Sequence, residues 1–561
     1  MNFPASLFYP SDAFDVDANQ VMGRRVAGRL LIKAFASSLS PGEEISFFTL
    51  GEPASHALRE LLKGALPDGA SARIFATYPS FDQLVSSGAF CIPDPSLAHW
   101  SSLRAGGHHA SFSLIGVIHT ICSEGVLKSL ADIPLAPLYS WDAIVCTSKA
   151  GQSVVSRVIE HRIEAIKRRF SSHAHQDSSL GMPSLPIIPL PGPQCQPFHP
   201  ELTRDQRRIK ARQSLGIAID DFVVVFVGRL SFHSKCHPLS LYRALQRLAE
   251  SNPSQSITLI ECGHQFNSHV AEAYEQLRSQ FANVNFYLVG GANPATEEEK
   301  WSCLAAADVF SSPVDNLQET FGLSVVEAMY AELPLVISDW SGYRDLVLDG
   351  VNGFLIPTYD LQAGHSGCDP IDIAYSSGKC NYDSMIGLRS LGVALDHDAY
   401  AKSFQLLLDD PSLRLKMSKA GLERYMLNYS VDAVARAYRG LLSELAQRRD
   451  EVLTRNSDIS YLPSYMPSHS EIFHHFPSAS IPFSDVVWTL VNPAATSHLY
   501  DKMNQELVSL IVGSGLHALV NLLLSQRCLS VQSIMALGYD EFRARATLAL
   551  LFKFGIVSPV K

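Results

Sequence analysis

The chain has 561 residues, of which 47% are apolar and 18% are charged, and its formal net charge at pH 7 is −10. This composition is typical of globular α/β proteins with large buried cores, and the length accommodates about three to four domains of ~150 residues. The acidic balance argues against a nucleic-acid-binding protein, because such proteins usually carry a basic surplus.

The ten cysteines are scattered and form no Cys-x-x-Cys pair, a pattern that favours reduced thiols over a disulfide framework or a zinc site. The first residues lack a basic segment followed by an apolar core, so we expect no signal peptide. No run reaches the ~18 apolar residues that a transmembrane helix needs. These features predict a cytoplasmic protein.

Short apolar runs alternate with helical patterns in the first part of the chain. Residues 22–37 and 57–66 have helical spacing, and buried strands are predicted at residues 45–50, 72–76, 112–118 and 141–146. Such alternation predicts a parallel, doubly wound sheet. A helix with basic stretches is expected at residues 150–170.

A proline-rich segment separates this part from a second α/β half. Residues 183–200 hold seven prolines, which disfavour regular structure and predict a hinge between domains. The second half begins near residue 220 and closes with helical residues 418–445. Its predicted strands are residues 222–227, 256–261, 284–289, 308–311 and 335–338.

Two glutamates, Glu319 and Glu327, lie on either side of the turn Phe321-Gly322-Leu323. The first is expected in a loop, where it reaches sugar hydroxyls, and the second about one turn into a helix, where it accepts hydrogen bonds from a ribose diol. Backbone N–H groups at the helix start favour an anion such as a diphosphate. Helices carry such glutamate pairs by chance, so the interpretation depends on the whole block of residues 307–338.

This block resembles the Glu-x7-Glu signature of the retaining glycosyltransferases of family 4, which adopt the GT-B fold. The resemblance covers residues 1–447 and implies two Rossmann-like domains facing a cleft. We therefore expect an acceptor domain at residues 1–190, a nucleotide-sugar domain at 191–447 with an insertion at 359–395, a linker at 448–497, and a small, mainly helical, winged-helix-like domain at 498–561.

A second block follows the strand at residues 222–227. Gly228 ends this strand, Arg229 comes next, and Lys235 follows after a short loop, so the two cations are able to straddle a diphosphate. An isolated pair of this kind is more often two surface cations in a polar loop. The resemblance implies that the pair stabilises the departing nucleoside diphosphate and that Gly228 lines the donor site, although the loop is one residue longer than usual and Cys236 replaces the customary glycine.

Two positions in the first half also match the family. His119 directly follows the run at residues 112–118; alone it would be a structural or surface histidine, whereas the resemblance implies sugar binding or stabilisation of transition-state charge. Gly23 either contributes to the donor site or simply begins a helix. Asp15 and Asp17 have the spacing of a metal-binding Asp-x-Asp motif, but we expect a solvated loop there. The resemblance implies that no metal is required, because in GT-B enzymes the cationic side chains and the helix dipole supply the electrostatic stabilisation.

The resemblance implies transfer of a hexosyl unit from a nucleoside diphosphate sugar to an acceptor hydroxyl with retention, in polysaccharide or glycoconjugate synthesis. The donor is a co-substrate, and no other cofactor is expected. The acceptor stays open among a glycan, a lipid-linked glycan and a protein. The alternative is a non-catalytic GT-B binding module whose C-terminal domain docks a protein or nucleic-acid partner.

Two groups of residues suggest which binding partners to expect. Residues 498–561 hold six Lys and Arg against four acidic residues, too few for a phosphate-binding surface, so a protein partner is favoured over nucleic acid. A cluster of cations in the helix at residues 150–170 forms either a solvated face or a peripheral contact with anionic lipid at the inner membrane face. The cluster comprises Arg162, Lys167, Arg168 and Arg169.

Overall fold

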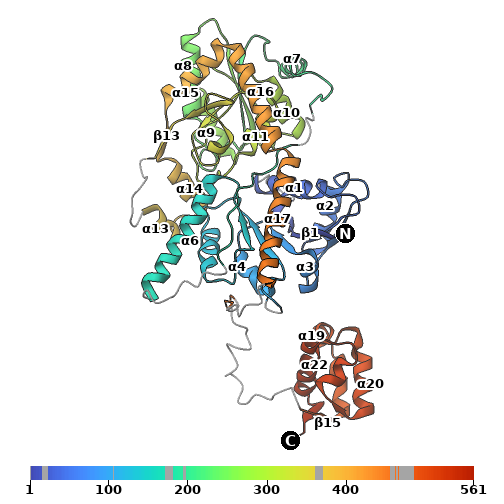
Figure 1. The fold of residues 1–561 in the computed structure, drawn as a ribbon. Coiled ribbons are helices and arrows are strands. Elements are labelled where there is room, and N and C mark those ends of the chain that lie inside the picture. Colours follow the sequence, from blue (N-terminus) through green and yellow to red (C-terminus); the bar gives the residue numbers. More distant parts are fainter. Residues whose placement is uncertain are drawn as a thin grey trace. The chain divides into compact units, whose positions relative to one another are not determined.

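The computed structural model describes residues 2–14, 23–104, 107–170, 181–193, 198–360, 370–454, 461–462, 465 and 486–560. The predicted solvated loop at Asp15 and Asp17 lies outside these residues. The chain divides into two compact units, Met1–Met466 and Pro467–Lys561. The first unit contains two six-stranded sheets (Figure 1), and the second contains a three-stranded sheet.

The first large sheet is parallel and has the order β3-β2-β1-β4-β5-β6. Its central strands are almost wholly buried, because helices cover both faces of a parallel sheet. The strands are β1 (Asn2–Phe8), β2 (Glu44–Phe48), β3 (Ser71–Phe75), β4 (Ala89–Ile92), β5 (Ser113–Val117) and β6 (Ala143–Val145). The helices are α1 (Gly23–Ser37), α2 (Gly51–Leu62), α3 (Phe81–Ser87), α4 (Leu97–Trp100), α5 (Glu124–Asp132) and α6 (Lys149–Phe170).

The second large sheet is also parallel, with the order β12-β11-β10-β7-β8-β9. Its strands are β7 (Phe222–Val227), β8 (Ile257–His264), β9 (Asn285–Gly291), β10 (Val309–Ser312), β11 (Leu335–Ser338) and β12 (Gly353–Ile356). Its helices include α7 (Arg204–Leu215), α8 (Leu239–Ser251), α9 (Ser268–Arg278), α10 (Glu297–Ala306), α11 (Leu323–Tyr330), α12 (Tyr343–Leu346), α15 (His397–Asp409) and α16 (Pro411–Asn428). The predicted pair of Rossmann-like domains is confirmed.

The chain crosses between these domains twice, and the two crossings lie against each other. The first crossing lies in the proline-rich segment, where Gly192 N–H donates to Tyr429 O at 2.7 Å. Tyr429 joins α16 to α17 (Val431–Thr454), which returns to the first domain. There Tyr438 packs on Phe35 of α1, with ring centroids 4.9 Å apart. The domain boundaries drawn from the sequence stay a prediction.

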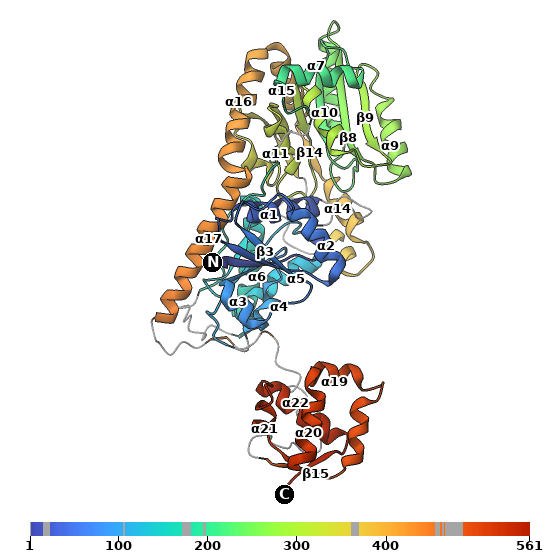
Figure 2. The same ribbon diagram turned by 90° about the vertical axis from the view of Figure 1, so that its right-hand side faces the viewer.

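The residues expected to form an insertion contain regular structure of their own. Strands β13 (Thr358–Asp360) and β14 (Val393–Leu395) pair antiparallel. Between them lie α13 (Pro370–Ser376) and α14 (Tyr382–Ser390). Both views place α14 between the domain of β7–β12 and the domain of β1–β6 (Figures 1 and 2).

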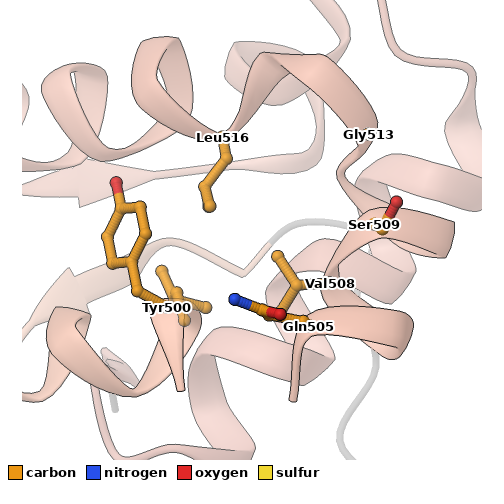
Figure 3. A pocket seen from close by; sticks show the side chains of 7 residues that line it. Tyr500, Gln505, Val508, Ser509, Gly513 and Leu516 are labelled. Atoms are coloured by element: carbon orange, nitrogen blue, oxygen red, sulfur yellow. The ribbon is translucent and has the colours of Figure 1, made fainter. Parts of the chain in front are cut away.

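The second unit is a mainly helical domain, as predicted. Its helices include α19 (Gln505–Ile511), α20 (Leu516–Gln526), α21 (Val531–Met535) and α22 (Glu541–Lys553). Short strands β15 (Trp488–Leu490), β16 (Cys528–Leu529) and β17 (Val557–Pro559) form an antiparallel sheet. A hollow of about 700 Å³ opens beside α19 and α20 and is lined by Leu499, Tyr500, Gln505, Val508, Ser509, Gly513 and Leu516 (Figure 3).

None of the helices within the described residues is both long enough and apolar enough to cross a membrane.

Candidate functional site

Lys235 and Glu319, two of the predicted site residues, form an ion pair. Lys235 Nζ donates to Glu319 Oε2 at 2.5 Å, and the side chains are 13% and 17% exposed. Burial opposes the charged form of both groups, but the mutual attraction is stronger. The pKa of Lys235 is therefore raised and that of Glu319 is lowered. The two charges neutralise each other in this arrangement.

Arg229 lies beside this pair, at the carboxyl end of β7. Its NH2 group donates to Gln318 Oε1 at 2.6 Å and to Ser234 O at 3.1 Å. Burial lowers the pKa of Arg229, and the charge of Glu319 acts in the opposite direction. The structure thus gathers Arg229, Lys235 and Glu319 into one cluster, in which two cations face a single carboxylate.

Glu327 lies in α11 and is bound by a residue that no sequence motif singled out. Lys300 of α10 donates from Nζ to Glu327 Oε1 at 2.7 Å and to Glu297 Oε1 at 2.9 Å. Burial alone would lower the pKa of Lys300, but the two carboxylates raise it. Lys300 therefore holds the Glu327 carboxylate in place.

The turn before α11 is sterically constrained. Gly322 has φ of +116°, and a Cβ added there would lie 2.5 Å from a ring carbon of Tyr343. Only glycine fits such a backbone and such a space. Phe321 is buried, its N–H donates to Glu319 Oε1 at 3.3 Å, and α11 begins at Leu323. The first N–H groups of a helix lack partners inside it and favour an anion.

His119 and Thr320 connect the two domains. Thr320 Oγ1 donates to His119 O at 2.5 Å, and Ser148 Oγ donates to Thr320 O at 2.7 Å. His119 is 9% exposed, and neither ring nitrogen has a hydrogen-bond partner within the described structure. Burial, reinforced by the charge of Arg24, lowers its pKa to about 4. The imidazole is therefore neutral near pH 7.

The two predicted glycines differ in what surrounds them. Gly228 joins β7 to Arg229, and its N–H donates to Cys262 O at 3.0 Å. Gly23 begins α1, and a Cβ added there would meet no atom within 4 Å. Gly28, which the sequence did not single out, is the close-packed glycine of this helix, because a Cβ there would lie 2.0 Å from Ala13 O.

Asp315 is a buried acid that sequence reasoning missed. It follows β10 and is 4% exposed; Oδ2 accepts from His237 N–H at 3.1 Å, while Oδ1 has no partner within the described structure. Burial raises its pKa to about 8, so its carboxyl group is largely protonated at pH 7. An isolated aspartate after a strand gives no sequence signal of this state.

Other predictions concern metals and lipids. The described residues contain no group of three or more His, Cys, Asp or Glu side chains arranged to hold a metal ion. Metal-independent chemistry stays a prediction. Arg162, Lys167 and Arg169 are exposed near the end of α6, where Arg168 pairs with Glu164 at 2.7 Å. Contact of this cluster with anionic lipid also stays a prediction.

Comparison with known proteins places the cluster in a recognised segment. Residues 207–367 match the family model described as "Glycosyl transferases group 1". The putative glycosyltransferase EpsD of Bacillus subtilis is 30% identical over 172 residues, which cover 31% of this chain and 41% of that protein. A D-inositol 3-phosphate glycosyltransferase of Corynebacterium diphtheriae is 30% identical over 187 residues, which cover 33% of this chain and 41% of that protein. The chain thus spans about two fifths of the length of these relatives.

Solved structures are more distant. A glycosyltransferase from Rickettsia africae is 12% identical, with a TM-score of 0.48 and coverage of 81% of this chain and 100% of that one. Sucrose-phosphate synthase from Thermosynechococcus elongatus is 17% identical, with a TM-score of 0.44, and the match covers 79% of this chain and 99% of that one. The segment that carries Arg229, Lys235, Glu319 and Glu327 is the part of this chain that is similar to group 1 glycosyltransferases.

Proposed function

We propose that the chain is a glycosyltransferase that moves a hexosyl unit from a nucleoside diphosphate sugar to an acceptor hydroxyl. The observation that carries this proposal is the cluster of Arg229, Lys235 and Glu319 before the glycine turn of α11, inside the segment similar to group 1 glycosyltransferases. Two partly buried cations beside helix N–H groups favour a diphosphate. The neighbouring carboxylate is suited to accept hydrogen bonds from sugar hydroxyls.

The roles follow from the contacts of each side chain. When a diphosphate arrives, Lys235 exchanges its bond with Glu319 for bonds to phosphate oxygens, and Arg229 supplies a second cation. Glu319 is then free to accept hydrogen bonds from the sugar. Glu327, held by Lys300, accepts from the ribose diol, and the backbone from Phe321 to Leu323 lies against the donor.

The proposed transfer retains the configuration at the anomeric carbon. The leaving diphosphate removes the proton of the attacking hydroxyl. Arg229 and Lys235 stabilise the negative charge that develops on the diphosphate. Neutral His119 lies near the reacting sugar and contributes a polar contact without adding positive charge. A polysaccharide or glycoconjugate is the acceptor class we favour, and catalysis needs no metal ion.

Binding of nucleoside diphosphates tests the donor site. Titration calorimetry with UDP, GDP and ADP should detect one preferred nucleotide, and Arg229→Ala should weaken its binding about 10–100-fold, since a charge-assisted hydrogen bond contributes ~1.5–3 kcal/mol. Arg243→Ala on α8 is the matched control, because Arg243 is exposed. Equal binding by wild type and Arg229→Ala would contradict the assignment.

A further inference from the structure

The helix α14 contacts the candidate site through Tyr382, the first residue of that helix. Gln318 Nε2 donates to Tyr382 Oη at 3.2 Å, and the Oε1 atom of the same amide accepts from Arg229 at 2.6 Å. A chain of two hydrogen bonds therefore connects the Tyr382 hydroxyl to the guanidinium.

The same hydroxyl also contacts the first domain. Tyr382 Oη lies 3.1 Å from Cys122 Sγ, and Tyr375 of α13 accepts from Glu124 N–H at 3.4 Å. Burial raises the pKa of Tyr382, and Cys122 adds to the shift, so the hydroxyl remains protonated and able to donate. Residues 370–390, which we call the strap, thus extend from the Arg229 loop to the start of α5.

Electrostatic interactions also connect the strap with the loop that carries Arg229. The carboxylate of Asp383, next to Tyr382, acts to raise the pKa of both Arg229 and His233, although burial has the larger effect and lowers both. Gly387 of α14 packs against His233, whose Cβ would lie 3.0 Å from a Cβ added to the glycine. The strap therefore contacts the loop that carries Arg229 at more than one point.

We propose that Tyr382 is a positioning residue for Arg229, and that the strap joins the two domains in the arrangement used for transfer; this rests on the proposed function. The physical reason lies in the Gln318 amide, which offers an acceptor at one end and donors at the other. Donation to Tyr382 turns the oxygen towards Arg229. Without the hydroxyl, the Gln318 amide is free to rotate and to turn its NH2 group towards Arg229. A guanidinium has no acceptor, so the hydrogen bond between Gln318 and Arg229 would then be lost.

Removal of this single hydroxyl tests the proposal. Tyr382→Phe should weaken binding of the preferred nucleoside diphosphate about 3–10-fold, in keeping with one hydrogen bond of ~0.5–1.5 kcal/mol. The control is Tyr359→Phe, since Tyr359 lies in the same insertion and its hydroxyl donates to Asp396 at 3.4 Å. This variant should bind as wild type does.

A double variant separates positioning from a general structural effect. If Tyr382 acts through Arg229, then Tyr382→Phe should cause no further loss of binding in an Arg229→Ala background. Independent, additive losses would overturn the proposal. If the wild-type protein binds the nucleotide and Tyr382→Phe binds it equally tightly, the proposal is also overturned. If the wild-type protein does not bind any of the nucleotides, the proposed function is overturned as well.

The contact with the first domain has a readout that does not depend on transfer. Tyr382→Ala should increase the rate of Cys122 alkylation by iodoacetamide at least several-fold, measured by peptide mass spectrometry. Cys528, which is exposed in the other unit, serves as the internal reference. An unchanged Cys122 rate in this variant would contradict the strap contact.

Discussion

The partly buried ion pair between Lys235 and Glu319 allows a quantitative test by a double-mutant cycle. The side chains are 13% and 17% exposed and their charged atoms lie 2.5 Å apart, so removal of one partner leaves the other charge largely desolvated. Breaking a fully buried pair costs ~3–5 kcal/mol, so the lower end of this range fits a partly buried one, whereas replacing both partners is far less costly. Lys235→Met should therefore destabilise the protein by about 3 kcal/mol.

The companion variants complete the cycle. Glu319→Gln should cost about 2 kcal/mol, because the amide still accepts a hydrogen bond from the ammonium. The double variant should cost about 2 kcal/mol in total, which corresponds to a coupling energy of about 3 kcal/mol. Urea unfolding followed by tryptophan fluorescence measures these differences. Additive losses in the double variant would refute the pairing.

The same variants should have opposite effects on ligand binding. Lys235→Met removes a cation from the proposed diphosphate site and should weaken binding of the preferred nucleoside diphosphate about 10–100-fold. Glu319→Gln leaves Lys235 without its competing carboxylate, so affinity for the free nucleotide should be equal to or greater than that of wild type. Transfer by Glu319→Gln should nevertheless fall, because the sugar loses its proposed acceptor.

Three further outcomes are expected. Burial raises the pKa of Asp315 from 3.8 to about 8, so between pH 4 and 8 this carboxyl group ionises in the unfolded chain but stays protonated in the fold. The fold should therefore become less stable as the pH rises through this range, by roughly 3–5 kcal/mol. Asp315→Asn should unfold at higher urea concentration than wild type at pH 8, and a lower concentration would contradict this. Because burial lowers the pKa of His119 from 6.5 to about 4, the contribution of His119 to stability should fall by about 2 kcal/mol between pH 7 and 5. Over this range wild type should therefore lose about 2 kcal/mol relative to His119→Gln, and the same pH dependence in both proteins would count against a buried neutral imidazole. Dialysis against EDTA should leave donor turnover unchanged, and loss of turnover that Mg²⁺ restores would contradict metal-independent transfer.

The sequence predicted most of the buried strands because their apolar runs are continuous. Strands β7 and β11 have the bounds expected from the sequence. Strand β4, with the four residues of Ala89–Ile92, was missed, since so short a run is not distinguishable from part of a helix. The strand bounds at β8 and β9 differ by a few residues because strand ends depend on pairing with a neighbour.

The candidate site was predicted only in its local motifs. The sequence placed Glu319 before a glycine turn and Arg229 after a strand, since both are local features. It could not predict that Lys235 pairs with Glu319, or that Lys300 holds Glu327, because these contacts join segments that are distant along the chain. The contact between Tyr382 and Gln318 was missed for the same reason.

The sequence also could not predict which polar groups are buried. Nothing in the residues near Asp315 indicates a carboxyl group with an unpartnered oxygen, and the shifted pKa arises from desolvation in the folded state. Thr320 lies inside the recognised block, yet only the folded chain reveals that its hydroxyl and its carbonyl both bond to the first domain.

The proposed function requires the chain to release a nucleoside diphosphate from a nucleotide sugar by means of the Arg229 cluster. The most direct measurement is nucleoside diphosphate release from UDP-, GDP- and ADP-hexoses, with purified wild type, Arg229→Ala and Arg243→Ala assayed together. Release should be donor-selective, should be retained in Arg243→Ala and should be at least 10-fold slower in Arg229→Ala. Release at the same rate by all three proteins, or by none of them with any donor, would contradict the proposed function.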